Sequence, residues 1–400
     1  MSREQLVRIA RRGVEHNKAG TQDQASGILE VPVGNYFEPD RWKLEMDRVF
    51  GRLPLVVGAS SEFTQSGAYR SLWIGDTPIL VSRGSDGELR AFVNMCSHRG
   101  AVVTEEGEGV ARRHSCPYHA WVYDTKGDLV GVLDADDFGE IDRDCLGLTR
   151  LACAERAGLV WVWLTGDPVI DIDTFLCGYG EMLEFLDLAE CHVAGRQEIA
   201  GPNWKVAYDG YLDLYHLPVL HRNTFGPDYG NKALYDSWGP HQRVTGPGRH
   251  FEQLEDLPED EWPVEVMTGG VWTIFPHVSI ASFDANGKVY MVSQLYPGSE
   301  PGTSKTTQMF LHTQPSDDEQ AEAMANVMTF LHHVVKDEDY YTGLRIQKAL
   351  QTGAKKVNIF GRNEGGGQRV HTFVDALLEV EDEDLSAFFK EAAETWGRDQ

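Results

Sequence analysis

Two short boxes of cysteine and histidine constrain this 400-residue chain more than any other part of its sequence. The first box has Cys-x-His spacing at Cys96 and His98, and the second has Cys-x-x-His spacing at Cys116 and His119. A fold that brings both boxes together makes a site with two thiolates and two imidazoles. Such a set can hold structural zinc, or a [2Fe–2S] centre in which two histidines replace two cysteines on one iron. The spacing favours the iron–sulfur centre, because each loop then gives one ligand to each iron.

A second group of potential metal ligands lies further along the chain. Asp209, Asp213 and His216 fall at i, i+4 and i+7, which is one face of a helix. A regular helix would point His221 away from that face, but Pro218 disfavours helical geometry at the residue before it and lets the chain turn. We therefore expect the two imidazoles to lie side by side. Two imidazoles with nearby carboxylates are what a non-heme Fe(II) site with open coordination positions requires.

The composition limits the partners and the compartment. The chain has 62 acidic and 36 basic residues, a formal charge of −26, which argues against nucleic acid or an anionic membrane as a partner. Residues 1–30 are polar and charged, and no stretch has the roughly 18 consecutive apolar residues of a membrane span. Six cysteines are too few for a disulfide framework. We expect a cytoplasmic protein that does not cross a membrane.

Hydrophobic periodicity divides the chain into three parts. Residues 1–50 predict short helices, and residues 51–165 predict short strands joined by hairpin turns, which is typical of an antiparallel β domain. Residues 166–400 predict a second antiparallel sheet with long helices, so we expect an α+β fold. Within this last part, residues 226–268 are rich in Gly, Pro and charge and predict a functional loop or lid.

Taken together, the motifs resemble those of a known family. The boxes Cys96-Ser97-His98-Arg99-Gly100 and Cys116-Pro117-Tyr118-His119-Ala120-Trp121, then Asn203-Trp204-Lys205 and Asp213-x-x-His216-x-x-x-x-His221, resemble the large (alpha) subunit of Rieske non-heme iron ring-hydroxylating oxygenases. Their order and separation match over essentially the whole chain. One departure is Ala120, which stands where the family usually has Gly and would crowd the cluster loop slightly. The resemblance implies an N-terminal Rieske [2Fe–2S] antiparallel β domain and a C-terminal catalytic domain of helix-grip (START-like) fold, against which residues 1–50 pack.

The resemblance also implies which residues bind each metal. Cys96 and Cys116 would bind the inner iron of the cluster, and His98 and His119 would bind the outer one. In this family two histidines and a carboxylate from a later helix bind the catalytic Fe(II), and the histidines correspond to His216 and His221 here.

The third ligand of the catalytic iron must come from the run Asp337-Glu338-Asp339. Asp339 shares a helical stripe with Val335 and Ile346, which suits packing inward, and the usual spacing in the family also favours it. Asp337 is the rival. Glu338 lies on a different stripe, which we expect to be solvated.

Asp213 is expected to connect the two metal sites. It lies close enough before His216 to accept the ring N–H and fix the tautomer. The resemblance implies that its other oxygen accepts a hydrogen bond from the His119 ring of a neighbouring subunit, because these enzymes are usually head-to-tail rings. We expect a homotrimer, and the sequence does not decide whether a small β subunit is also present.

Electrons must come from another protein. The chain has no dinucleotide fingerprint, since Gly365-Gly366-Gly367 has no predicted strand–helix context. NAD(P)H would therefore act only through a separate reductase, with or without a ferredoxin. We expect the docking face for an acidic electron donor to be formed by basic residues near the cluster boxes, namely Arg99, Arg112, Arg113 and His114.

The substrate pocket should lie over the catalytic iron, with O2 as co-substrate. Besides Asp209, the candidate walls are mostly apolar, which suits an aromatic or alicyclic ring; they are Leu212, Leu217, Trp272, Phe275, Val278 and Phe283. The expected activity is monohydroxylation or cis-dihydroxylation of such a ring. Oxidative N- or O-demethylation, for example of a quaternary ammonium or methoxy compound, uses the same machinery and stays open. An electron carrier of the Rieske ferredoxin type would not need the second motif.

Overall fold

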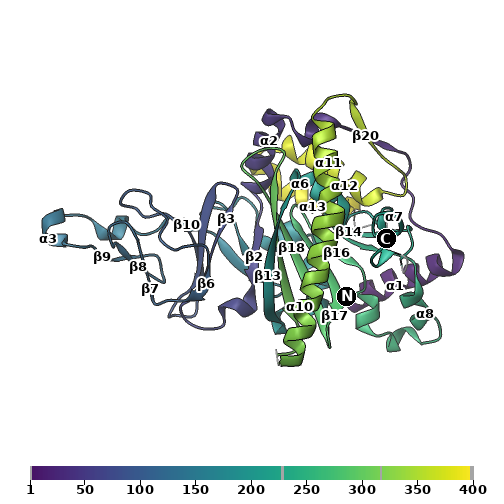
Figure 1. Cartoon of the computed structure of the whole chain (residues 1–400), viewed down its shortest axis with the longest axis horizontal. Helices are drawn as coiled ribbons and strands as arrows, with labels where there is room; N and C mark the ends of the chain where they lie inside the picture. The colour runs from purple at the N-terminus through teal and green to yellow at the C-terminus, as the bar shows by residue number, and fades with distance from the viewer. Residues whose placement is uncertain (1, 227–228, 316–317, 397–400) are drawn as a thin grey trace.

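The computed structural model describes residues 2–226, 229–315 and 318–396. An arm built from the N-terminal β domain projects from a larger part that holds a seven-stranded sheet and most of the helices (Figure 1). Among the described helices, none combines the length and the apolar character that crossing a membrane would require.

The arm contains three small antiparallel sheets. The first has the order β10-β5-β4-β3-β6, with β3 (Ala68–Ile74), β4 (Thr77–Arg83), β5 (Leu89–Val93), β6 (Gly107–Val110) and β10 (Arg150–Leu151). The second, β11-β12-β2, consists of β2 (Leu55–Ala59), β11 (Cys153–Arg156) and β12 (Leu159–Val162). The third, β7-β8-β9, consists of β7 (Arg113–Ser115), β8 (Val122–Asp124) and β9 (Leu129–Gly131), and the short helix α3 (Ala135–Phe138) lies at the outer end of the arm (Figure 1).

The larger part is organised around one antiparallel sheet. Its order is β13-β19-β18-β17-β16-β15-β14, with β13 (His192–Gly201), β14 (Leu234–Trp238), β15 (His241–Thr245), β16 (Val271–Ile274), β17 (Val278–Asp284), β18 (Lys288–Pro297) and β19 (Ser304–His312). The helices around it are α4 (Ile172–Leu176), α5 (Tyr179–Leu183), α6 (Trp204–Tyr211), α7 (Leu217–Leu220), α8 (Arg249–Glu255), α9 (Val264–Met267), α10 (Asp318–His333), α11 (Tyr341–Leu350), α12 (Gly365–Leu378) and α13 (Leu385–Trp396). A π-helical segment, η9 (Val334–Tyr340), joins α10 to α11. An antiparallel sheet packed with helices on this plan is the expected α+β fold.

The N-terminal segment belongs to the larger part. It contains α1 (Ser2–Ala19), β1 (Leu29–Pro32), α2 (Pro39–Glu45) and a π-helical turn, η2 (Met46–Phe50). Strand β1 pairs with β20 (Val357–Phe360), and α1 packs on α8. The remaining short 3₁₀ turns are η1 (Val33–Tyr36), η3 (Ser60–Phe63), η4 (Arg143–Cys145), η5 (Glu184–Leu186), η6 (Leu188–Glu190), η8 (Glu259–Glu261) and η10 (Asp382–Asp384).

The two faces of the large sheet contact different neighbours. Residues paired across strands share a face, so Ser279, Ser293 and Gln308 line up on one of them. That inner face is covered by α6, which packs on β18, and by α10. The outer face carries Gln294 and Tyr296, whose side chains both donate to the carbonyl of Val56 in β2, at 2.8 and 2.6 Å. The arm is therefore attached to the outer face of the sheet. The helices that precede the expected metal ligands cover its inner face.

The prediction that residues 226–268 form a loop or lid is wrong. Strands β14 and β15 and helices α8 and α9 lie within this segment. The segment looked like a loop because it is polar, but part of that polarity is a buried ion pair. Arg243 and Asp236 are each 1% exposed, and Arg243 Nη2 lies 2.7 Å from Asp236 Oδ2. Buried charges need such a partner, so here they mark a core rather than a surface.

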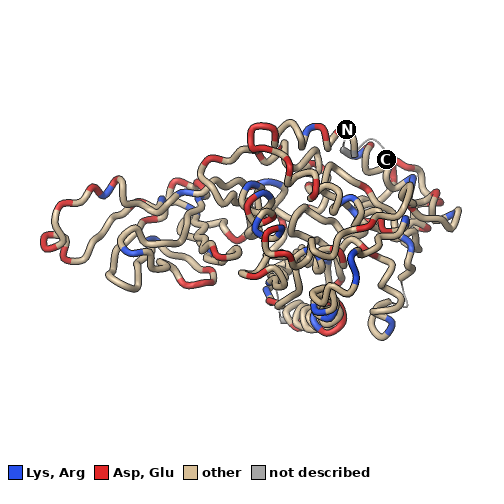
Figure 2. Tube along the Cα trace, turned by 90° about the horizontal axis from the view of Figure 1, so that it is seen from above, with Lys and Arg blue, Asp and Glu red and all other residues tan. Residues whose placement is uncertain are grey.

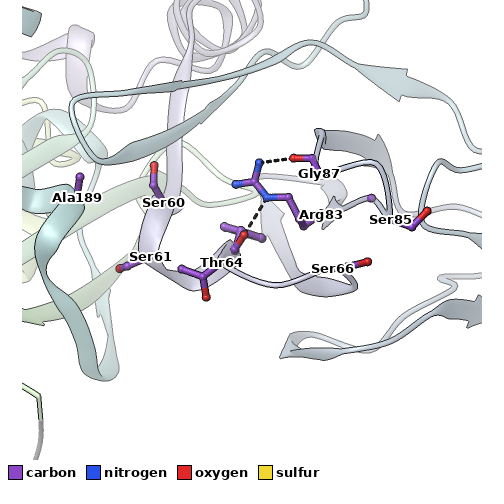
Figure 3. A pocket seen from close by; sticks show the side chains of 10 residues that line it. Ser60, Ser61, Thr64, Ser66, Arg83, Ser85, Gly87 and Ala189 are labelled. Atoms are coloured by element: carbon purple, nitrogen blue, oxygen red, sulfur yellow. Dashed lines mark hydrogen bonds between the residues drawn. The ribbon is translucent and has the colours of Figure 1, made fainter.

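A hollow of about 470 Å³ lies where the arm meets the larger part, and Figure 3 shows its hydroxyl-rich lining. Arg83 extends into it and donates to the carbonyls of Phe63 and Gly87, at 2.8 and 3.1 Å. The same guanidinium forms two 2.9 Å hydrogen bonds with the carboxylate of Glu155. Its charge is thus already compensated within the protein.

Candidate metal centres

The two cysteine–histidine boxes form matching loops after β5 and after β7. In each loop an amide four residues on donates to the cysteine carbonyl, Gly100 to Cys96 at 2.9 Å and Ala120 to Cys116 at 3.1 Å. Both turns require a left-handed residue, since φ is +77° at Gly100 and +53° at Ala120. This conformation strains any residue with a Cβ. The departure at Ala120 therefore acts on the backbone conformation, whereas the sequence suggested steric crowding.

The four expected cluster ligands lie together at these loops. Cys96 and Cys116 are 2% and 3% exposed, and the rings of His98 and His119 are 4.7 Å apart. Nδ1 of each histidine is buried and has no hydrogen-bond partner among the described residues. Two inward sulfurs and two unpaired imidazole nitrogens are the donor set of a [2Fe–2S] cluster with mixed ligands, so the residues fit that group.

Aromatic residues and a tyrosine hydroxyl surround these ligands. The hydroxyl of Tyr123 lies 3.2 Å from Sγ of Cys96. Trp121 stacks on His98 at 4.9 Å, and Phe138 from α3 meets the same ring edge-on at 5.4 Å. The sulfur side of the site is thus buried, and the imidazole side faces the end of the arm.

The prediction that His114 belongs to the donor-docking face is wrong. Arg99, Arg112 and Arg113 are exposed, but His114 is 4% exposed and its Nδ1 lies 3.0 Å from the hydroxyl of Thr104. Burial lowers the pKa of His114 to about 4. The reason is strand alternation, because neighbours in β7 point to opposite sides. Acidic residues also gather at the outer end of the arm (Figure 2).

The second centre brings together His216, His221 and Asp339. One ligand atom from each lies within 4.8 Å of the others, and this is the one such group of three in the described chain. Oδ1 of Asp339 is 3.2 Å from Nε2 of His221 and 3.6 Å from Nε2 of His216. Two imidazoles and one carboxylate on one side of an ion are the facial set of a non-heme Fe(II) centre, so these residues fit such an ion.

A carboxylate holds the other nitrogen of each histidine. Nδ1 of His216 lies 3.1 Å from Asp213, and Nδ1 of His221 lies 2.6 Å from Glu338. The hydroxyl of Thr224 also donates to Glu338, at 3.0 Å. Accepting the Nδ1–H proton leaves the Nε2 lone pairs directed at the shared position, which is the usual arrangement at metal-binding histidines.

Asp213 does not reach His216 along a helix, as the i, i+4, i+7 pattern predicted. Helix α6 ends at Tyr211, and the Asp213 carboxylate accepts the backbone N–H of Tyr215 in the turn that follows. Pro218 occupies the first turn of α7, where its missing N–H costs nothing. The break in the helix therefore comes earlier than Pro218, and it turns both imidazoles inward.

A π-helical segment decides the roles of the three consecutive acids. Asp339 faces the two histidines, whereas Asp337 is exposed and lies 2.9 Å from His333. The expectation that Glu338 is solvated is wrong, since its side chain is 15% exposed and contacts His221. The wider i→i+5 turn changes the helical phase of these residues and brings two successive carboxylates toward one site more readily than a 3.6-residue period does.

The carboxylates set the electrostatics of this centre. Burial lowers the pKa of His216, but its hydrogen bonds to Asp213 and Asp339 outweigh burial and raise the pKa to about 9. Burial raises the pKa of Asp339, and the two histidines outweigh it in the other direction, so the net shift is downward. The site thus attracts positive charge.

The expected pocket residues are scattered. Trp272 and Val278 lie on the outer face of the sheet, where Trp272 stacks on Tyr179 at 5.7 Å, so their assignment to the pocket is wrong. Strand alternation places them opposite Ser279. Phe275 packs against Phe373 at 5.3 Å in the main core.

Three further pocket candidates lie on the inner face of the large sheet or on the chain that follows α6. Phe283 is on the inner face and packs in a small core with Met324 and Leu331 of α10. Leu212 is buried directly after α6, and Leu217 follows His216 at the start of α7.

Asp209 is already engaged. Its carboxylate accepts a hydrogen bond from the hydroxyl of Tyr36 at 3.0 Å and lies 3.0 Å from Nε2 of His371.

Sequence reasoning missed an aromatic residue at the proposed iron site, since Phe225 stacks on His221 at 4.7 Å. The position of Phe225, four residues after the expected metal ligand His221, was the available signal.

The two centres lie far apart within one chain. The cluster loops are at the free end of the arm, beside α3, and α7 is on the far side of the larger part (Figure 1). A single chain therefore separates the two metal sites along its longest axis.

Comparisons with known proteins agree with this geometry. Residues 54–138 match the family model of the Rieske [2Fe-2S] domain, and residues 188–380 match that of the ring hydroxylating alpha subunit, catalytic domain. The chain is 33% identical over 205 residues to the chlorobenzene dioxygenase alpha subunit of Cupriavidus sp. (strain PS12), covering 48% of this chain and 44% of that protein. It is 32% identical over 200 residues to the glycine betaine monooxygenase oxygenase subunit of Chromohalobacter salexigens, covering 50% and 44%. The chain spans about half the length of the curated relatives it matches.

Solved structures share the fold. The quaternary ammonium Rieske monooxygenase CntA superposes with a TM-score of 0.73 at 19% identity, covering 87% of this chain and 95% of that chain. Naphthalene 1,2-dioxygenase from Rhodococcus sp. superposes with a TM-score of 0.72 at 19% identity, covering 94% and 99%. With a Rieske domain, a catalytic domain and the relatives above, the chain belongs to the family of Rieske ring-hydroxylating oxygenase alpha subunits.

Proposed function

We propose that this chain is a terminal oxygenase that uses O2 to mono- or cis-dihydroxylate an aromatic or alicyclic ring. The observation that carries the proposal is the His216–His221–Asp339 group, whose histidines are both oriented by carboxylates. The test is product mass spectrometry under ¹⁸O₂ with reduced protein and a panel of ring compounds. Two labelled oxygens in one product indicate a dioxygenase, and one indicates a monooxygenase. No label in any product from protein with full iron content contradicts the proposal.

The residues divide the work between two metals. When bound, a [2Fe–2S] cluster at Cys96, His98, Cys116 and His119 supplies single electrons, and Fe(II) at the second centre activates O2. Asp213 and Glu338 hold the imidazoles of the second centre in one tautomer and orientation. Phe225 covers one face of His221 and excludes water there. Keeping reduction and oxygen chemistry on separate metals limits wasteful release of peroxide.

We propose that electrons pass between subunits of a homotrimer, from His119 of one chain through Asp213 to His216 of the next. The separation of the two centres within one chain supports this path (Figure 1). The solved structure of a quaternary ammonium Rieske monooxygenase gives insight into inter-subunit electron transfer in that enzyme. Exposed aromatic residues stand beside both ends of the path, Tyr118 (56% exposed) next to His119 and Tyr215 (55% exposed) next to His216. Such residues suit an interface between copies.

Mixing two inactive variants tests the path. Cys116→Ala removes the cluster, and Asp339→Ala removes the catalytic iron. Mixed assemblies of the two chains should regain activity, because an intact cluster in one subunit then faces an intact iron site in the next. Complementation is lost if Asp213→Ala is added to the chain with the intact iron site. Absence of any recovery in verified mixed assemblies would rule out transfer between subunits.

We propose a separate reductase, with or without a ferredoxin, as the electron donor, so NAD(P)H acts only through that partner. Arg99, Arg112 and Arg113 are exposed basic residues in or just before the cysteine–histidine boxes. Charge reversal at Arg112 and Arg113 should slow reduction by an acidic donor at low salt and have little effect at high salt. Unchanged reduction at low salt would exclude this docking face. None of the six cysteines forms a disulfide bond, which fits a reducing cytoplasm.

Oxidative N- or O-demethylation is the second candidate. It is favoured by the similarity to a glycine betaine monooxygenase subunit. The same ¹⁸O₂ experiment separates the two, because demethylation yields formaldehyde and a demethylated product instead of a hydroxylated ring.

A further inference from the structure

A row of uncharged polar residues crosses the inner face of the large sheet. Cross-strand pairing links Gln242 to Thr273, Thr273 to Ser279, Ser279 to Ser293 and Ser293 to Gln308. Each of these five residues is at most 1% exposed. A sheet core is normally apolar, so a continuous polar row at its centre needs a reason.

The middle of this polar row lacks hydrogen-bond partners. The hydroxyls of Ser279 and Ser293 and the amide nitrogen of Gln308 are buried, and none makes a well-formed hydrogen bond with a described residue. The same holds for the hydroxyls of Tyr208 and Tyr211 on α6. Tyr208 lies close to Thr273, and Tyr211 lies close to Ser293 and Gln308, but these contacts lack good hydrogen-bond geometry. Leaving such groups poorly paired costs free energy that a ligand oxygen can recover.

One end of the row is fully paired, and the other end is paired through one of its two polar atoms. The Gln242 side chain donates to the carbonyl of Gly366 at 3.1 Å and accepts from Arg369 at 2.9 Å. At the other end, Oε1 of Gln308 accepts from Gln197 at 2.6 Å. The free hydrogen-bonding capacity is therefore concentrated between β17, β18 and β19.

This centre lies between the two elements that carry the iron ligands. The inner face is covered by α6, which leads into His216, and by α10, which leads through η9 into Asp339. Tyr211 stands next to Tyr340, and the charge of Asp339 acts on both tyrosines. The polar row is thus the floor of the proposed iron site.

We propose that Ser279, Ser293, Gln308 and the two tyrosines form a subsite for a neutral oxygen substituent of the substrate, a hydroxyl or a carbonyl. This rests on the proposed function. The row contains hydroxyls and amides but no charged side chain, and the acids at the iron site, Asp213 and Glu338, would repel a carboxylate. A charged substituent buried on this floor would lack a counterion, which is costly. A carbonyl can accept hydrogen bonds from these groups, and a hydroxyl can both accept from them and donate to them.

Equilibrium dialysis under argon with the iron-loaded protein tests the subsite without turnover. The probes are matched pairs, phenol with benzene, 2-naphthol with naphthalene, and cyclohexanone with cyclohexane, together with 2-naphthoate and phenyltrimethylammonium. At least one oxygenated member should bind about tenfold more tightly than its hydrocarbon partner. Ser293→Ala and Ser279→Ala should each remove most of that preference and leave hydrocarbon binding unchanged.

Ser82→Ala is the matched control. Ser82 is 0% exposed and its hydroxyl also has no partner among the described residues, but it lies in β4 of the arm. This variant should keep the preference in full. The inference is overturned if no pair shows a preference, if both serine variants weaken both members of a pair equally, or if a charged probe binds most tightly. The binding preference is independent of ¹⁸O incorporation, so failure of the subsite and failure of the oxygenase proposal give different results.

Discussion

The carboxylate of Glu338 lies 2.6 Å from Nδ1 of His221, and the next residue, Asp339, faces Nε2 of the same ring at 3.2 Å. Two adjacent residues thus contact both nitrogens of one imidazole. The π-helical geometry of η9 favours this arrangement, because it separates consecutive side chains by a smaller angle than a regular helix does.

Removing the Glu338 carboxylate should weaken iron binding at the second centre. We expect Glu338→Ala to lower the affinity for Fe(II) by about 10- to 100-fold, since His221 loses the acceptor that fixes its tautomer. Metal titration of the apo site checks this, with the visible spectrum of the cluster as an internal reference. Asp337→Ala is the control, because Asp337 is exposed and pairs with His333. Equal affinities in both variants would show that Glu338 does not orient the ligand.

Asp213→Asn should separate electron delivery from metal binding. The amide keeps the size of the side chain but no longer accepts two hydrogen bonds as a carboxylate does, and its contact with His216 is weakened. We expect both metals to be retained and the oxidation of the reduced cluster by O2 in the presence of substrate to slow by about tenfold or more. Stopped-flow absorbance of the cluster measures the rate. A normal rate would mean that Asp213 has no part in the path.

Ala120→Gly should stabilise the cluster loop. Ala120 has φ of +53°, and relief of that strain is worth roughly 1 kcal/mol, partly offset by the greater entropy of glycine in the unfolded chain. Loss of visible cluster absorbance on heating should therefore shift to higher temperature. Ala111→Gly in the same domain is the control and should give no gain, because Ala111 is not among the residues with positive φ. A lower midpoint for Ala120→Gly would contradict the argument.

Stability should fall as pH decreases from about 6.5 toward 4, and His241 should contribute to the slope. The buried ring accepts the N–H of Phe275 at 3.2 Å and donates to the carbonyl of Phe175 at 2.8 Å, so it must be neutral. Burial lowers the pKa of His241 to about 4. The unfolded chain has a histidine pKa near 6.5 and so binds more protons in this window, which lowers the free energy of unfolding by up to about 1.4 kcal/mol per pH unit.

His241→Gln should flatten this dependence, since glutamine can keep both hydrogen bonds without titrating. Urea unfolding followed by tryptophan fluorescence at pH 7, 6 and 5 compares the two proteins. The wild type and the variant share their carboxylates, so the difference between their slopes isolates the histidine. Parallel slopes would show that His241 is not a neutral buried group.

Local motifs made the family and the two-part α+β fold predictable. Cys96 and His98, or Cys116 and His119, are close in sequence, so each pair shares a loop whatever the rest of the chain does. Their donor atoms and spacing limit the group they can hold. The same is true of His216 and His221, which one short turn brings together. Comparison with known families confirms the recognition that these motifs allowed.

Only the tertiary structure decided how the floor and the support of the iron site are built. Glu338 looked solvated because a 3.6-residue period was assumed, and the π-helical turn changed which side chains share a face. Trp272 looked like a pocket wall, but strand register put it on the opposite face from Ser279. The polar row depends on pairing between five strands, which no local pattern encodes. Short-range spacing determines which ligands a loop presents, whereas helix pitch and strand register, set by packing across the whole domain, determine what those ligands face.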